Sequence, residues 1–257
     1  MDRLSSSSLA LTGQSEQHLS AERAADATAD AAADAVGARM HLAVLPDFLA
    51  LRDAARAAGF DLAVHSAFRD FPRQLSIWNR KASGLLAVLD SNARPIDIRT
   101  LSERDLVFAI LRWSALPGTS RHHWGTDLDV YDAATTPTGY DIQLIPAEVD
   151  PGGMHGPLHE WLDARMASGT AFGFFRPYDI DRGGVAPERW HLSHAPLAST
   201  FAQRLTPELL RPILTGADLH LKEVVLHELE HIFHRFVTNI SQPPRLVAPA
   251  TPNEPGA

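Results

Sequence analysis

Hydrophobic positions along the chain follow helical spacing in some segments and strand-like spacing in others. Apolar residues recur at helical spacing from Phe48 to Ala58 and stop before Gly59, which predicts an amphipathic helix that ends at a glycine. The short apolar segment 62–66 follows it and predicts a strand. The same reasoning predicts further helices over 74–82, 103–113 and 158–166, and a strand with alternating sides over 127–131.

These short strands and helices lack the regular rhythm of parallel βαβ units. Segments rich in Gly and Pro interrupt the elements at 117–118, 151–153 and 183–184, and no repeat of fixed period is present in the sequence. A doubly wound parallel sheet would require strands and helices in strict alternation. The pattern therefore predicts a fold of the α+β class.

The two ends of the chain differ in composition from its middle. Residues 21–35 are mostly Ala with an Asp at every fourth position, which allows a helix but offers little to bury, so we expect a solvated spacer there. From Gln242 onwards the chain is Pro-rich and weakly hydrophobic, as in disordered tails. We expect a Ser/Ala-rich N-terminal extension over 1–39, a folded domain over 40–240 and a disordered tail over 241–257.

Composition narrows the classes of function. The 257 residues are 45% hydrophobic and 21% charged, which is typical of a globular protein with one domain or two small ones. The formal net charge is −8, which disfavours general binding to the phosphate backbone of nucleic acid. Because the chain has no Cys, disulfides and thiolate nucleophiles are excluded, and any metal must be bound by His, Asp or Glu.

Hydropathy bears on the cellular location. No run approaches the ~18 consecutive apolar residues of a transmembrane helix, so we expect no membrane span. The first eight residues, MDRLSSSS, lack the apolar stretch of a secretory signal. We therefore expect a cytoplasmic protein.

Two segments carry the residues that a metal-dependent hydrolase needs. In the first, Asp129 follows His122 by seven residues, and a turn at Gly125 between them would let both side chains reach one point. In the second, Glu188 precedes His191 by three residues. A catalytic zinc site needs three protein ligands and one open position. His122, Asp129 and His191 would supply the ligands, with Glu188 as the general base.

Spacing alone leaves ordinary roles open for each of these residues. Asp129 could cap a turn, His191 could be a hydrogen-bonded core histidine, and Glu188 could lie on the surface. These ordinary roles are the more frequent ones for short motifs. Beside the candidate ligands, His123 would point to the opposite side of an extended segment, and Trp190 would pack against the site.

A second metal motif, His-Glu-x-x-His, occurs at 227–231 and is the signature of the zincin metalloproteases. At 100° per residue the apolar residues of this segment gather on one side, and His227, His231 and His234 lie nearly opposite. His227 and His234 are also roughly 10 Å apart along the helix axis, which is too far for one ion. We expect an amphipathic helix with solvent-facing histidines, and a zincin endopeptidase is the alternative.

Three motifs occur in order along the chain: Ser66-x-x-Arg69 followed by Gln74, then Ser120-x-His122-x-x-Gly125-x-x-x-Asp129, then Glu188-x-Trp190-His191. Together they resemble the motifs of the VanY-type D-alanyl-D-alanine carboxypeptidases, which are related to the vancomycin-resistance D,D-dipeptidases and to the Hedgehog signalling domain. The resemblance covers most of the chain from about residue 40 onwards.

The resemblance implies a zinc peptidase with one Zn²⁺ per chain. Its ligands would be His122, Asp129 and His191, and Glu188 would be the catalytic base. The related proteins also imply the fold: a small antiparallel sheet flanked by helices, as in the Hedgehog and D,D-peptidase zinc proteins.

The same resemblance implies roles in substrate binding. Arg69 matches the family arginine that interacts with the substrate near the scissile carbonyl, and a planar guanidinium suits a carboxylate or an oxyanion. A surface arginine in a local ion pair is the alternative. Ser120 and Gln74 match positions that help to hold the substrate terminus. Asp127 departs from the family, which usually has Ala there, and would either support the metal ligands or change substrate preference.

The implied substrate is a peptide with a free C-terminal carboxylate, namely a peptidoglycan stem peptide ending in D-Ala-D-Ala. L,D-carboxypeptidases, D,D-dipeptidases and cell-wall endopeptidases of the same family are alternatives, as is a zinc-binding module without catalysis. Glu188 argues against the binding module, which needs no general base. Peptidoglycan lies outside the cytoplasmic membrane, so a cytoplasmic enzyme would act on precursors or recycled wall fragments.

Overall fold

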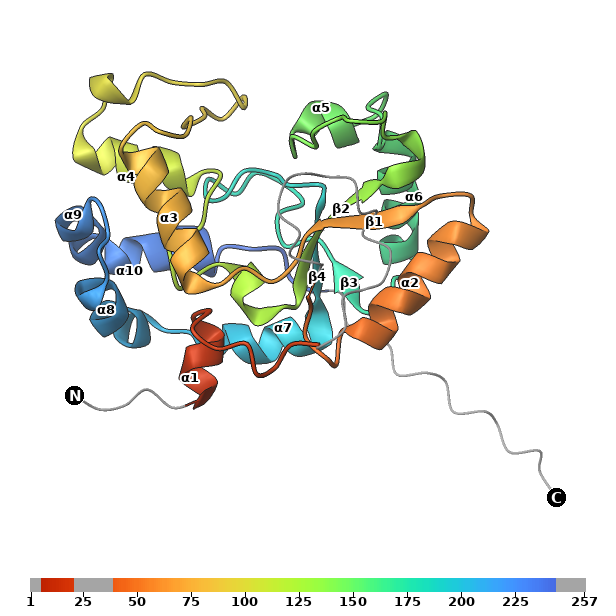
Figure 1. Cartoon of the computed structure of the whole chain (residues 1–257), viewed down its shortest axis with the longest axis horizontal. Coiled ribbons are helices and arrows are strands. Elements are labelled where there is room, and N and C mark those ends of the chain that lie inside the picture. The colour runs from red at the N-terminus through yellow and green to blue at the C-terminus, as the bar shows by residue number, and fades with distance from the viewer. Residues whose placement is uncertain (1–5, 21–38, 244–257) are drawn as a thin grey trace.

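The computed structural model describes residues 6–20 and 39–243, which form a small sheet flanked by helices (Figure 1). The sheet has four antiparallel strands in the order β1-β2-β4-β3. Their bounds are Leu62–Ser66 for β1, Asp127–Asp132 for β2, Phe174–Phe175 for β3 and His191–His194 for β4. The predicted α+β class and the small antiparallel sheet are confirmed.

Strand pairing separates an apolar face of the sheet from a polar one. On β2 and β4, Leu128 lies directly opposite Leu192, and Asp129 lies directly opposite His191. Residues that face each other across two strands share a face of the sheet, and successive residues alternate between faces. The leucines therefore enter one core, while the carboxylate and the imidazole meet on the other side.

The apolar face of the sheet packs against two helices, α2 (Leu45–Ala57) and α6 (Gly156–Ala167). Phe48 and Leu51 of α2 are buried there with Leu158 of α6. Full burial of such a side chain contributes about 1.5–3 kcal/mol. This core fixes the position of β2 and β4, and so of the polar residues on their other face.

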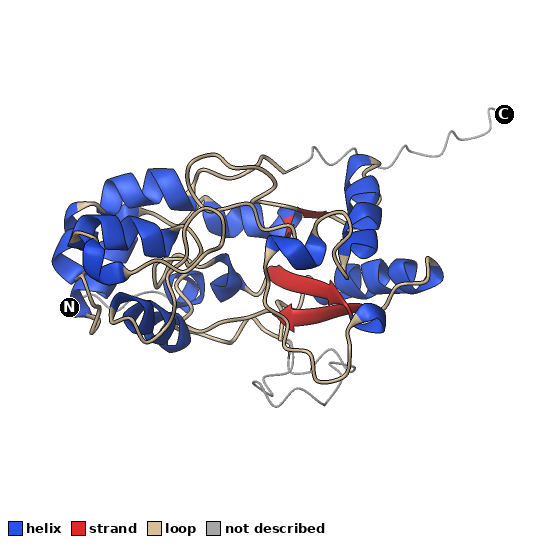
Figure 2. Cartoon of the chain, turned by 90° about the horizontal axis from the view of Figure 1, so that it is seen from above, coloured by secondary structure: helices blue, strands red, loops and turns tan. Residues whose placement is uncertain are grey.

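A second core joins the helices at the other end of the molecule, which Figure 2 shows as a group beside the sheet. Trp78 is fully buried in this core, and its indole N–H donates to the carbonyl of His220. The helices that contribute to this core are α3 (Phe71–Ala82), α4 (Glu103–Leu111), α7 (Ala195–Ala202), α8 (Pro207–Gly216), α9 (Lys222–His227) and α10 (Leu229–Ile232), with the π-helical turn η4 (Phe233–Val237).

Shorter elements complete the described part of the chain. They are α1 (Ser6–Leu11), α5 (Pro146–Val149) and the 3₁₀ turns η1 (Ile98–Thr100), η2 (Arg121–Trp124) and η3 (Ala133–Thr135). Residues 6–20 pack against η2 and the start of α3: the Trp124 indole donates to the Leu11 carbonyl, and the Phe71 N–H donates to the Gly13 carbonyl.

The helices predicted over 48–58, 74–82, 103–113 and 158–166 and the strands predicted over 62–66 and 127–131 are confirmed with small shifts of their ends. The single helix expected through 227–231 is instead divided between α9, α10 and η4, and β3 and β4 were not predicted. Both are too short to show a period of two in the sequence. The expected spacer at 21–35 and most of the expected tail lie outside the described residues. None of the described helices is long and apolar enough to cross a membrane.

Candidate metal centre and active site

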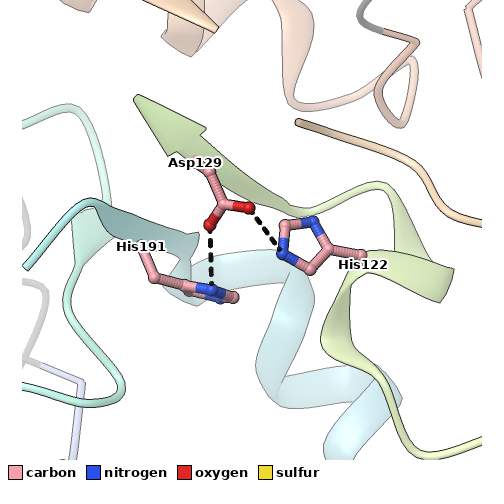
Figure 3. Close-up of side chains that lie close together, drawn as sticks. All are labelled: His122, Asp129 and His191. Atoms are coloured by element: carbon pink, nitrogen blue, oxygen red, sulfur yellow. Dashed lines mark ion pairs between the residues drawn. The ribbon is translucent and has the colours of Figure 1, made fainter. Parts of the chain in front are cut away.

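The polar face of the sheet brings together the three predicted metal ligands (Figure 3). His122 lies in η2, Asp129 in β2 and His191 in β4, and all three side chains are buried. Asp129 stands between the two imidazoles: its Oδ2 is 3.3 Å from His122 Nε2 and its Oδ1 is 3.3 Å from His191 Nδ1. One ligand atom from each residue lies within 4.8 Å of the others.

This arrangement fits a zinc ion. Nitrogen and oxygen ligands at 2.0–2.1 Å from a tetrahedral ion lie roughly 3.3 Å from one another, and the two contacts of Asp129, one through each carboxylate oxygen, have this length. Asp129 Oδ1 is also buried without a hydrogen-bond donor in the described structure. A buried carboxylate oxygen without a donor is costly unless it is paired or binds a metal. The donor set of two imidazoles and one carboxylate is one that zinc accepts.

The residue directly after β1, Ala67, sets the orientation of the His122 ring. Its Nδ1–H donates to the carbonyl of Ala67 at 2.7 Å, so the lone pair of Nε2 points toward Asp129. Gly125 follows η2 with a left-handed φ of 66° and turns the chain into β2. The expected turn at this glycine is confirmed, and it places the ligand of η2 beside the ligand of β2.

A buried network orients His191 from its other side. Its Nε2–H donates to Asp127 Oδ1 at 2.9 Å, which leaves Nδ1 facing Asp129. The same Asp127 oxygen accepts from Arg121 Nε at 2.7 Å, and Arg121 also donates to Ser193 Oγ. Asp127 is fully buried, and all its contacts are internal. Of the two roles expected for Asp127, these contacts favour support of the ligand.

Electrostatics at this point of the molecule favours a cation. Burial disfavours the charged form of His191, but the neighbouring carboxylates of Asp127, Asp129 and Glu188 outweigh it and hold the pKa of His191 well above its usual value. Burial alone would raise the pKa of Asp129, yet His122 and His191 keep that pKa well below its usual value. Three carboxylates therefore concentrate negative charge around the two imidazoles.

Glu188 lies at the edge of the ligand group. Its Oε2 is 3.4 Å from His191 Nδ1, and the side chain is 14% exposed. The backbone holds it there, because the Glu188 N–H donates to the Tyr178 carbonyl and the Glu188 carbonyl accepts from the His191 N–H. The next residue, Arg189, is anchored in the opposite direction by Asp163 and the Val149 carbonyl. Glu188 is thus both near the ligands and accessible to water.

Arg69 lies in the loop between β1 and α3 and is partly buried. Its Nη1 donates to Gln74 Oε1 at 3.0 Å and its Nη2 to Ser66 Oγ at 3.2 Å. Burial lowers the pKa of Arg69, whereas the nearby carboxylates of Asp129 and Glu188 raise it. The alternative of a surface ion pair is not what the structure shows, since the described partners of this guanidinium are neutral.

Gln74 and His123 hold the Arg69 loop in place. Gln74 is fully buried in α3, and its amide N–H donates to the Ala115 carbonyl at 2.7 Å while its oxygen accepts from Arg69. His123 donates from Nδ1 to the Arg69 carbonyl and accepts at Nε2 from the Gly118 N–H. Burial lowers the pKa of His123 to about 3, so the ring is neutral. As expected, His123 takes no part in the ligand group.

Two further expectations concern Ser120 and Trp190. Ser120 is buried at the start of η2, and its hydroxyl has no hydrogen bond to any residue in the described part of the chain. Trp190 is buried and stacks on Trp113 with ring centroids 6.5 Å apart, as a packing residue would.

Sequence reasoning did not single out two residues that support His191, one through Asp127 and one by direct contact. Arg121 neutralises Asp127, and the Tyr178 ring packs edge-on against His191 at 5.1 Å. Asp127, where the family usually has Ala, was the signal that could have pointed to Arg121, since a buried Asp requires a cation or hydrogen-bond donors. No local pattern pointed to the second.

The His-Glu-x-x-His segment forms no metal group. The helix is broken at Glu228, between α9 and α10, and His227, His231 and His234 are exposed. Glu228 is paired with Arg104 at 2.8 Å and contacts His231 at 3.2 Å. Within residues 6–20 and 39–243, the group close enough to hold a metal is His122, Asp129 and His191.

Comparison with known proteins identifies similar chains. The family model described as VanY: D-alanyl-D-alanine carboxypeptidase matches residues 37–197. An uncharacterized protein of Haemophilus influenzae is 32% identical over 124 residues, which cover 48% of this chain and 92% of that protein. A D-alanyl-D-alanine carboxypeptidase of Enterococcus faecalis is 28% identical over 158 residues, which cover 60% of this chain and 48% of that protein.

Solved structures with similarity include VanYB in complex with D-alanine-D-alanine, at 23% identity and a TM-score of 0.45, covering 72% of this chain and 87% of that chain. A variant of the vancomycin-resistance D,D-pentapeptidase VanY in complex with Zn(II) is 22% identical with a TM-score of 0.44, covering 75% of this chain and 86% of that chain.

Proposed function

Because the chain belongs to the VanY D-alanyl-D-alanine carboxypeptidase family, we propose that it is a zinc-dependent carboxypeptidase that hydrolyses the terminal D-Ala-D-Ala amide bond of peptidoglycan stem peptides. The observation that carries this proposal is the meeting of His122, Asp129 and His191 on one face of the sheet with Glu188 beside them. The three ligands come from separate segments, so their meeting is not a product of local sequence.

His122, Asp129 and His191 would hold one Zn²⁺. When bound, zinc at such a site acts as a Lewis acid and makes water a stronger nucleophile at neutral pH. Asp127 keeps the imidazole of His191 in the tautomer whose Nδ1 is free to act as a ligand.

Glu188 supplies proton transfer. A general base must lie within hydrogen-bonding reach of the attacking water, and Glu188 Oε2 lies at the edge of the ligand group. It takes a proton from water as the oxygen adds to the amide carbonyl, and it returns that proton to the leaving nitrogen as the C–N bond breaks. The products are the shortened peptide and free D-Ala.

Arg69 binds the oxygen that gains negative charge on the substrate carbonyl. A guanidinium stays protonated at working pH and offers two parallel donors. Gln74 uses both ends of its amide within the protein, so its part is to position Arg69. The Ser120 hydroxyl, with no partner in the described structure, is available to the substrate terminus.

Mass spectrometry of a stem pentapeptide ending in D-Ala-D-Ala, incubated with the zinc-loaded protein, tests the proposal. We expect release of a single D-Ala, and a loss of about 10²- to 10⁴-fold in kcat for Glu188→Gln. Glu228→Gln is the matched control and should keep full activity. Release of a dipeptide would indicate a D,D-dipeptidase, and cleavage of a tetrapeptide instead would indicate an L,D-carboxypeptidase of the same family.

Zinc content separates the two metal motifs in the same preparations. We expect His122→Ala and His191→Ala to lose stoichiometric zinc, while His227→Ala and His231→Ala keep it. Bound zinc without cleavage of any stem peptide would contradict the proposed activity and favour a zinc-binding module.

A further inference from the structure

Two neighbouring histidines of η2 hold the backbone of Arg69. The Arg69 carbonyl accepts from His123 Nδ1 at 2.6 Å, and the Arg69 N–H donates to the His122 carbonyl at 3.1 Å. His123 Nε2 in turn accepts from the Gly118 N–H at 3.1 Å, and the ring is fully buried. The backbone of Arg69 is therefore fixed through both its N–H and its carbonyl, and one of its two partners is a candidate metal ligand.

The segment 6–20 covers the ring of His123. Gly13 lies against the imidazole, so closely that a Cβ at this position would be 2.7 Å from the ring Cγ. The φ of Gly13 is 75°, in the left-handed region that glycine adopts without strain. The Gly13 carbonyl accepts from the Phe71 N–H at 2.8 Å, where the Arg69 loop enters α3. One residue of the segment thus contacts both the imidazole and the loop that the imidazole holds.

Further contacts on either side of this glycine reach the same two elements. Toward the N-terminus, the Leu11 carbonyl accepts from the Trp124 indole N–H at 3.0 Å, at the end of η2. Toward the C-terminus, Glu16 pairs with Arg39 at 2.6 Å, and the Arg39 carbonyl accepts from the Phe68 N–H at 3.0 Å. Trp124 and Phe68 each lie within two residues of a site residue in the sequence. The segment therefore bears on η2 and on the Arg69 loop together.

Residues 6–20 precede the region 37–197 that the family model matches, so family membership implies no role for them. We propose that this segment positions the Arg69 guanidinium for catalysis, with Gly13 and His123 as the positioning residues. The inference rests on the proposed function, in which Arg69 binds the oxygen that gains negative charge. A displacement of about 1 Å in such a group costs on the order of 100-fold in rate, so contacts that fix its backbone contribute to kcat.

A segment that only stabilises the fold would behave differently. Loss of stability lowers the fraction of folded protein, and activity and zinc content then fall together. Loss of positioning lowers the kcat of protein that is folded and zinc-loaded, and it changes KM less, because Arg69 binds the transition state more strongly than the substrate. The kcat measured per zinc-loaded molecule therefore separates the two roles.

Two amide replacements of His123 separate its two hydrogen bonds. The amide of Asn lies near the position of Nδ1 and that of Gln near the position of Nε2, so Asn keeps the donor toward Arg69 and Gln keeps the acceptor toward Gly118. With zinc-loaded protein and the stem pentapeptide, we expect His123→Gln to lower kcat about 10- to 100-fold and His123→Asn only about threefold. Equal kcat for both variants, at equal zinc content, would overturn the inference.

Gly13→Ala tests the segment itself. The added Cβ overlaps the His123 ring, so either the ring or the segment must shift. Gly59→Ala is the matched control, since Gly59 has a φ of 93° and no atom within 4 Å of the added Cβ. We expect Gly13→Ala to lower kcat roughly tenfold at full zinc content, and Gly59→Ala to keep the native kcat. A native kcat in Gly13→Ala would contradict the role of the segment.

Hydrogen exchange followed by NMR tests the positioning without turnover. The Phe71 N–H is bonded to Gly13 and the Arg69 N–H to His122, so both should exchange slowly in native protein. We expect Gly13→Ala to speed exchange at both sites by about tenfold, and Gly59→Ala to leave it unchanged. If native protein cleaves no stem peptide, the proposed function fails, and exchange alone decides whether the segment holds the loop. Native exchange rates at both sites in Gly13→Ala would show that it does not.

Discussion

Asp127 controls the imidazole of His191 without contacting the other two candidate ligands. Its Oδ1 accepts hydrogen bonds from both His191 and Arg121, and its Oδ2 accepts from Thr126. We expect Asp127→Asn to lower zinc affinity about 10- to 100-fold, because a carboxylate behind a histidine ligand fixes its tautomer and raises its basicity. Competition with a chromogenic chelator measures this affinity directly.

Asp132→Asn provides the comparison for this variant. Asp132 is also a buried carboxylate of β2, but it accepts from the backbone N–H groups of Asp61 and Ala134, away from the metal ligands. The Asp132→Asn substitution should lower the free energy of unfolding without changing zinc affinity. Equal zinc affinities for the two variants would show that Asp127 acts only on stability.

At the scale of elements, the turn between η2 and β2 sets the distance between two metal ligands. Gly125 has a φ of 66°, and a Cβ there would lie 2.7 Å from a methyl group of Leu19 and 2.8 Å from the backbone nitrogen of His41. The side chain of Leu19 could move, but the backbone of His41 is held by its hydrogen bond to the Gly125 carbonyl. The turn therefore leaves no room for a side chain.

We predict that Gly125→Ala destabilises the protein more than Gly169→Ala. Gly169 has a similar φ of 70° but no atom within 4 Å of the added Cβ, so it reports the backbone cost alone, about 1–2 kcal/mol. Overpacking at Gly125 should add roughly 1–3 kcal/mol in urea unfolding, with a loss of zinc affinity that Gly169→Ala does not show. Equal losses of stability in Gly125→Ala and Gly169→Ala would indicate that Leu19 and His41 move aside without a cost in free energy.

At the scale of the whole molecule, burial of neutral histidines makes stability depend on pH. His159 in α6 is fully buried, and burial, together with the charges of Arg176 and Arg189, lowers the pKa of His159 to about 2. The unfolded chain binds a proton near pH 6.5, and the folded protein does not. Stability is therefore complete above pH 6.5 and falls as the pH decreases toward 2.

This linkage predicts a difference between native protein and His159→Gln. The native protein should lose about 1.5 kcal/mol more than the variant between pH 6.5 and pH 5, since one proton is taken up on unfolding. Urea titrations in the presence of a chelator measure this without competition between protons and metal. Parallel pH profiles for the two proteins would show that His159 is already protonated in the folded state.

Periodicity in the sequence anticipated the longer elements but not the pairing of strands. The helices around Phe48 and Gln74 have apolar stripes that a helix can bury on one side. In contrast, β4 covers only His191–His194 and carries no periodic signal of its own. Its register against β2 depends on the fit of Leu192 into the core, which is a property of distant residues.

The sequence by itself determined the fold class and the candidate ligand residues, because their types and order along the chain are local properties. Only the tertiary structure decided that Asp129 meets His191 across two strands, and that Asp127 turns inward to Arg121. These contacts join segments more than 60 residues apart or depend on burial, and burial is set by the packing of the whole chain.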